Sequence, residues 1–148
     1  MTKSQRLKPV IKASDTKERD TARALAESKR ILTERQARLA DLNTYREEYT
    51  ARFSAWGKNG IPAIQLHEYR VFLANLNAAI VHQEKLIENS QREFEGKLRI
   101  WYQARSRSKA LNSVVAKHHK EETRAETRRE QSAEDERYSL IKENDRDS

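Results

Sequence analysis

The sequence contains no cysteine and has few of the residues that interrupt helices. Without a thiol, neither a disulfide framework nor thiolate chemistry is available. The 148 residues include only three glycines and two prolines, and no apolar run approaches the roughly 18 residues of a membrane span. The first residues are basic with no apolar segment after them, which argues against a secretory signal. We therefore expect a cytoplasmic protein without a membrane-spanning helix.

Apolar residues are also scarce. They make up 36% of the chain, and charged residues make up another 36%, whereas ordinary globular domains have about 45–50% and about 25% respectively. The remainder is dominated by residues that favour helices. This composition favours a long helix or a coiled coil, with partial disorder as the competing interpretation.

One short stretch breaks the helical composition. The segment W-G-K-N-G-I-P, residues 56–62, holds two of the three glycines and one of the two prolines. It predicts a turn at about residues 57–62, with Gly57 as a left-handed helix stop. The expected fold is all-α, a long antiparallel two-helix coiled-coil hairpin. Its helices are predicted over about residues 12–56 and about 63–118, the first one capped by Ser14 or Asp15.

A 3–4 spacing of seam residues supports the coiled coil on both sides of the turn. In the first arm these residues are Leu25, Ser28, Leu32, Arg35, Leu39, Leu42, Arg46, Tyr49, Phe53 and Trp56. In the second they are Leu66, Tyr69, Leu73, Leu76, Ile80, Gln83, Ile87, Ser90, Phe94, Lys97, Trp101, Ala104, Ser108, Leu111, Val115 and His118. The register that suits the turn pairs Phe53 with Tyr69 and Trp56 with Leu66.

The apolar pattern stops after Val115. We therefore predict a single coiled-coil domain over residues 1–118 and a polar tail over residues 119–148. The composition of the tail is compatible with a frayed helical extension or with disorder.

No group of residues predicts catalysis or cofactor binding. The four histidines lack the helical His-Glu spacing of a zinc site, and there is no phosphate-binding glycine loop or nucleophile elbow. A two-helix protein also offers no deep pocket that could exclude water around a reaction. We expect no enzyme, no metal and no cofactor.

The net charge of +7 is unevenly distributed. No acidic residue lies between Glu95 and Glu121, and the basic residues of this window are predicted to lie at the open end of the hairpin, where they could face an acidic protein cavity or acidic lipid. Few stacking aromatics accompany them, so nucleic acid is not the expected partner. The candidate residues are Lys97, Arg99, Arg105, Arg107 and Lys109.

A second apolar stripe lies beside the seam near the turn. Its residues follow helical spacing on both arms, and a two-helix hairpin has no further element to cover them. They either widen the seam or form a patch for a partner protein. The residues are Leu42, Tyr45, Tyr49, Phe72, Leu76 and Ala79.

Several short motifs resemble the FliJ family of flagellar export proteins. They are Y-R-E-E-Y at residues 45–49, G-x-x-G-I at 57–61, Y-R-V-F-L-A-N-L-N-A-A-I at 69–80 and W-Y-Q-A-R-S-R-S-K-A-L at 101–111. The resemblance extends over most of residues 15–115. Arg38 departs from it, since a family member can carry Gln at this place, a turn before Leu42.

The resemblance implies an antiparallel coiled coil similar to the stalk subunit of rotary ATPases. It also implies three partners: the hexameric flagellar export ATPase, the cytoplasmic part of the export gate membrane protein, and export chaperones. The location would be cytoplasmic, peripheral on the inner membrane at the flagellar base. The family's gate-contacting surface falls on the second apolar stripe, and the stalk analogy directs the basic end toward the ATPase ring.

Two alternative functions remain open from the sequence. One is the equivalent central rod of a virulence-type III secretion system. The other, from a different class, is a basic coiled coil that binds nucleic acid.

Overall fold

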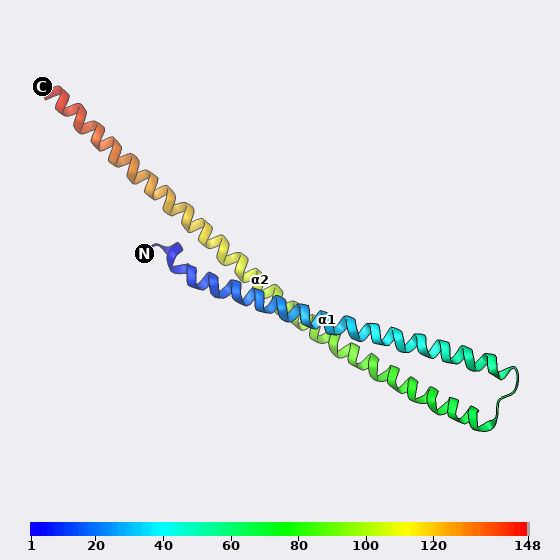
Figure 1. Ribbon diagram of the computed structural model, residues 1–148. Coiled ribbons are helices and arrows are strands. Elements are labelled where there is room, and N and C mark those ends of the chain that lie inside the picture. The colour runs from blue at the N-terminus through cyan, green and yellow to red at the C-terminus, as the bar shows by residue number, and fades with distance from the viewer. Residues whose placement is uncertain (148) are drawn as a thin grey trace. The chain divides into compact units, whose positions relative to one another are not determined.

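The computed structural model describes residues 1–147, which form two long helices. Helix α1 spans Lys3–Gly57, helix α2 spans Ala63–Asp147, and a short loop joins them (Figure 1). No strand occurs among the described residues, so the all-α prediction is confirmed. The chain divides into two compact units to which both helices contribute. Asp20–Tyr102 forms the loop unit, and Met1–Arg19 with the chain from Gln103 onward forms the terminal unit.

In the loop unit, α1 and α2 pack antiparallel along the predicted seam. Leu32 is 2% exposed and Ile80 is 3% exposed, and buried or half-buried positions recur every third or fourth residue on both helices. Phe53 stacks on Tyr69 with ring centroids 3.5 Å apart, which is the pairing that the predicted register requires. The coiled-coil prediction is thereby confirmed at the level of individual contacts.

A polar layer interrupts this seam and is fully hydrogen-bonded. The Arg35 guanidinium donates to the Leu86 carbonyl at 3.1 Å and to the Ser90 hydroxyl, and the Gln83 amide donates back to the Arg35 carbonyl at 3.0 Å. Gln83 and Ser90 are buried. Since an unpaired polar group there would be costly, these reciprocal bonds favour one register of the helices.

Helix α1 begins earlier than the sequence analysis predicted. Its start is Lys3 rather than about residue 12, because Thr2 and Gln5 form a capping box. The backbone N–H of Gln5 donates to the Thr2 hydroxyl, and the backbone N–H of Thr2 donates to the side-chain oxygen of Gln5, both at 3.3 Å. Ser14, one of the predicted caps, is instead a buried residue inside the helix.

In the terminal unit, the seam also continues beyond its predicted limits. Asp15, the other predicted cap, accepts a hydrogen bond from the Ser108 hydroxyl at 2.7 Å. Farther along, the carboxylate of Glu122 accepts bonds from the Ser4 amide at 3.2 Å and from the Ser4 hydroxyl at 2.6 Å. Helix α2 thus satisfies one of the free N–H groups at the start of α1.

The predicted fraying or disorder of the tail is not confirmed, because α2 continues through it to Asp147. Residues 126–147 are all exposed, and Figure 1 shows this last part of α2 extending without a neighbouring helix. The segment contains no glycine or proline and is rich in residues with high helix propensity. Local interactions such as the Lys142 ammonium 5.9 Å from the Tyr138 ring centre accompany the helical conformation.

The loop uses its glycines differently from the prediction. Gly60, with φ of 82°, has the only positive φ among the described residues, so Gly57 is not the left-handed stop. The Asn59 amide donates to the Trp56 carbonyl at 3.1 Å, and the Gly60 amide donates to the Gly57 carbonyl at 3.4 Å. These bonds end α1 with a tight turn before the chain reverses at Gly60.

The glycines offer a direct stability test. Gly60→Ala should lower the free energy of unfolding by about 1–2 kcal/mol, because alanine is strained at positive φ. Gly96→Ala should raise it by about 1 kcal/mol, because Gly96 lies within α2 and a Cβ there meets no atom within 4 Å. Urea unfolding followed by circular dichroism measures both changes. Equal effects of the two substitutions would contradict the assigned conformations.

A second test concerns Glu122. Hydrogen bonds from Ser4, with a smaller contribution from His119 and His118, lower the pKa of the Glu122 carboxyl. The stabilisation is therefore present above the ordinary glutamate pKa of about 4.3 and is lost as the pH falls through the lowered value. We expect Glu122→Gln to speed hydrogen exchange at the Ser4 amide at neutral pH. Unchanged exchange would show that the contact does not hold the start of α1.

Candidate functional site

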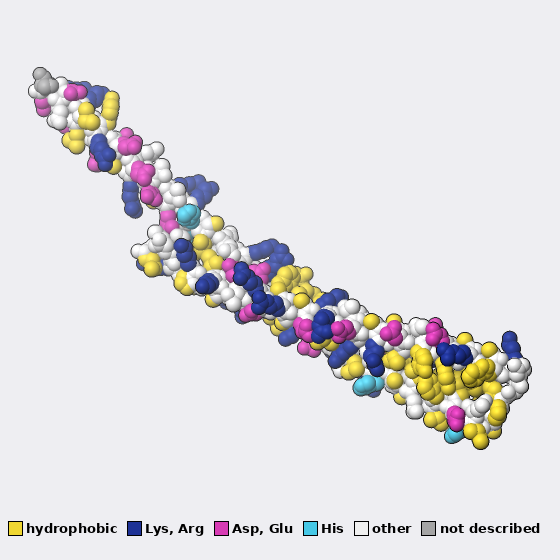
Figure 2. All heavy atoms as spheres, viewed as in Figure 1, with side chains coloured by type: hydrophobic (Ala, Val, Ile, Leu, Met, Phe, Trp, Pro, Cys, Tyr) yellow, Lys and Arg dark blue, Asp and Glu magenta, His cyan; other side chains and the backbone are white. Residues whose placement is uncertain are grey.

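An aromatic cluster near the loop contains three of the predicted patch residues. Tyr45, Tyr49 and Phe72 pack together from the two helices, with the Tyr49 and Phe72 ring centroids 4.4 Å apart and the Tyr45 and Phe72 centroids 5.9 Å apart. Tyr49 also stacks on Tyr69 at 5.4 Å. Figure 2 shows hydrophobic side chains gathered at this part of the molecule.

The cluster packs the two helices together and still leaves apolar surface in solvent. Tyr45 is 46% exposed, whereas Tyr49 and Phe72 are half-buried. Aromatic rings that are held rigidly and remain partly exposed are typical of protein interaction sites, because little side-chain entropy remains to be lost on binding. We call the surface formed by Tyr45, Tyr49 and Phe72 the aromatic face.

The other predicted patch residues differ in how much surface they offer. Leu76 is only 7% exposed and belongs to the core of the seam. Leu42 is half-buried on α1, and Ala79 is exposed on α2. The rings therefore supply most of the apolar surface that is available to a partner.

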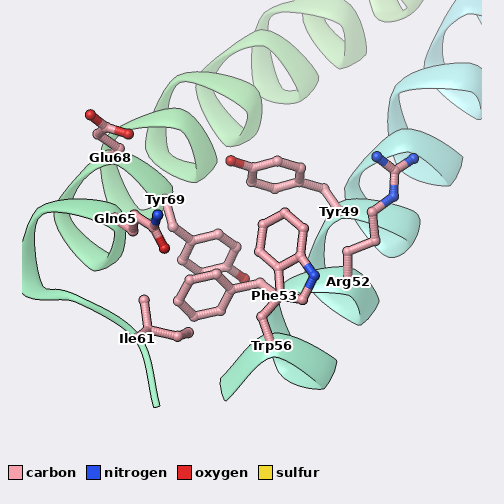
Figure 3. Close-up of a pocket in the computed structure, with 8 residues that line it drawn as sticks. All are labelled: Tyr49, Arg52, Phe53, Trp56, Ile61, Gln65, Glu68 and Tyr69. Atoms are coloured by element: carbon pink, nitrogen blue, oxygen red, sulfur yellow. The ribbon is translucent and has the colours of Figure 1, made fainter. Parts of the chain in front are cut away.

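An open pocket of about 220 Å³ lies next to the loop, beyond the aromatic face (Figure 3). This pocket was not predicted from the sequence, because the 3–4 spacing put Trp56 on the seam opposite Leu66. In the structure Trp56 is 63% exposed, since it lies in the last turn of α1, next to the loop. The lining residues are Tyr49, Arg52, Phe53, Trp56, Ile61, Gln65, Glu68 and Tyr69.

The predicted basic residues are divided between the two units: Lys97 and Arg99 belong to the loop unit, and Arg105, Arg107 and Lys109 belong to the terminal unit. Lys97 is half-buried, and Arg99, Arg105, Arg107 and Lys109 are exposed. With 3.6 residues per turn, Arg105 and Lys109 lie four positions apart on the same side of α2, whereas Arg107 points away from both. A partner that contacts all three of these exposed residues of the terminal unit would have to reach more than one side of α2.

Within the terminal unit, an acidic residue of α1 lies beside this basic stretch of α2. Asp15 is bonded to Ser108, which stands between Arg107 and Lys109 in the sequence. Residues 1–19 carry six Lys or Arg residues against Asp15 and Glu18, so α1 adds to the positive charge of the terminal unit.

Within residues 1–147, no group of three or more His, Cys, Asp or Glu residues could hold a metal ion. None of the helical segments described is both long and apolar enough to cross a bilayer.

A sequence model of the family described as "Flagellar FliJ protein" matches residues 2–144. The chain belongs to the FliJ family. No curated protein and no solved structure matches it. The matched family is a non-enzymatic component of the flagellar protein export apparatus, and this family is the one that the motifs around the loop predicted. The FliJ match extends into the segment that the sequence analysis treated as a tail.

Alanine substitutions should distinguish aromatic residues that stabilise the fold from those that lie mainly at the surface. Phe53→Ala removes a ring stacked between the helices and should cost about 2 kcal/mol, less than the 3–5 kcal/mol of a fully buried ring. Tyr45→Ala should cost less than about 1 kcal/mol, since its side chain is largely exposed. Urea unfolding checks both values. A larger loss for Tyr45→Ala would mean that the aromatic face is mainly structural.

Proposed function

We propose that this FliJ-family chain links the hexameric export ATPase to the cytoplasmic part of the export gate protein and also interacts with export chaperones. The aromatic face carries this proposal. It is an ordered, partly exposed apolar surface on a protein of two helices, and nothing in the described chain covers Tyr45. Such a surface is more useful to a binding protein than to an enzyme.

The gate protein is the proposed partner of the aromatic face. Tyr45 and Phe72 meet edge to face at an angle of 76°, so the two helices together present a shaped surface. Separating the helices would divide this surface. Binding at the aromatic face therefore depends on the folded hairpin and not on either helix alone.

The basic residues of α2 are the proposed contact with the ATPase ring. Because Arg107 lies on a different side of α2 from Arg105 and Lys109 in the terminal unit, these residues suit an enclosing, acidic cavity better than a flat surface. With these two contacts the protein would work in the cytoplasm, peripherally at the inner membrane where the flagellum is assembled.

Paired binding measurements test the proposal. The double variant Tyr45→Ala with Phe72→Ala should bind the cytoplasmic part of the gate at least about tenfold more weakly and bind the ATPase normally. The double variant Arg107→Glu with Lys109→Glu should bind the ATPase at least about tenfold more weakly and bind the gate normally. Val81→Ala is the matched control, since Val81 is 51% exposed on α2 and lies outside both sites.

If the Tyr45→Ala, Phe72→Ala variant binds the gate normally and its helical circular dichroism is unchanged, the aromatic face is not the gate-binding surface. Binding to DNA that falls steeply with salt and does not depend on Tyr45 would favour the nucleic-acid alternative.

A further inference from the structure

The pocket beside the loop continues the aromatic face. On α1, Tyr45, Tyr49, Arg52 and Trp56 follow one another at intervals of three or four residues, so they lie along one side of the helix. On the other side of the pocket, Phe72, Glu68, Gln65 and Ile61 repeat the same spacing toward the loop. Tyr49 belongs to both surfaces, because it contacts Phe72 and also lines the pocket.

The interior of the pocket is formed by rings. Figure 3 shows Phe53 from α1 and Tyr69 from α2 between the two ribbons, with Ile61 on the loop side. Trp56 remains 63% exposed at the edge of the pocket. A large, mostly exposed indole beside an open pocket lined by rings and by polar side chains is an arrangement into which a partner side chain can insert.

The size of the pocket limits what it can hold. About 220 Å³ is less than the roughly 300–1,000 Å³ of pockets that bind small molecules. It suits a single bulky apolar side chain. The rim also carries Arg52 and Glu68, which form no ion pair with other residues of the described chain. Polar groups of the partner, next to its inserted side chain, can therefore accept hydrogen bonds from Arg52 and donate hydrogen bonds to Glu68.

We infer that the protein that covers the aromatic face also inserts a bulky apolar side chain into this pocket, beside Trp56. Given the proposed function, on which this inference rests, the occupant is a side chain from the cytoplasmic part of the gate protein. A single partner is favoured because Tyr49 belongs to both surfaces: it contacts Phe72 and it lines the pocket.

The test uses the full chain labelled with 5-fluorotryptophan, since its two tryptophans provide a probe and an internal control. Adding the cytoplasmic part of the gate should shift the fluorine resonance of Trp56 and leave that of Trp101 in place. Trp101→Phe assigns the two signals. Trp56→Ala should weaken gate binding about tenfold or more.

Ile64→Ala is the matched control for affinity. Ile64 is 74% exposed near the loop but does not line the pocket, so its loss should leave gate binding unchanged.

Three results would overturn the inference. If the gate binds through Tyr45 and Phe72 while the Trp56 resonance stays in place and Trp56→Ala binds normally, the pocket is not used, although the proposed function stands. If the gate does not bind at all, the proposed function and the inference fail together. If the Trp56 resonance moves with the concentration of this chain alone, the occupant is a second copy.

Discussion

Burial along one narrow seam is the interaction on which the rest of the structure depends. Two helices can cover only one stripe of each other, so few side chains are fully enclosed, and Leu32 and Ile80 are among them. Polar residues fill much of the remaining seam, and they do so with cross-helix bonds such as that from Arg35 to Ser90. The stability of the hairpin therefore rests on many small contacts, and its register rests on the few positions where a polar group has one suitable partner.

The same constraint explains why surface near the loop is available for binding. A third helix would cover the flanks of the seam, but no described element does so. Large rings at Tyr49, Phe53 and Phe72 fill the space between the helices and also extend past it. The aromatic face is thus a direct result of packing aromatic side chains into a two-helix seam. One set of residues holds the helices together and presents apolar surface to solvent.

Helix ends account for most of the differences between prediction and structure. Ser14 or Asp15 was predicted to cap the start of the first helix, but the Thr2–Gln5 capping box lies upstream and α1 runs through Pro9. The box follows the sequence pattern expected of it, so the signal was present in the sequence. The contribution of Glu122 could not be predicted in this way, because it depends on which residue of α2 lies beside Ser4. The left-handed glycine was likewise assigned to the wrong candidate, since Gly57 and Gly60 both suit a turn by residue type.

By itself, the sequence determined the fold class, the turn, the seam and the family, because each depends on local composition or on spacing along the chain. The 3–4 repeat identifies the residues that face the other helix, and the motifs around the loop identify the family from the sequence alone. Only the tertiary structure decided which rings touch, how much of Tyr45 remains exposed and that Trp56 borders a pocket instead of filling the seam. Those properties depend on the distance between two helices next to their loop. Periodicity records which side of a helix a residue occupies, but not how closely the opposite helix approaches it.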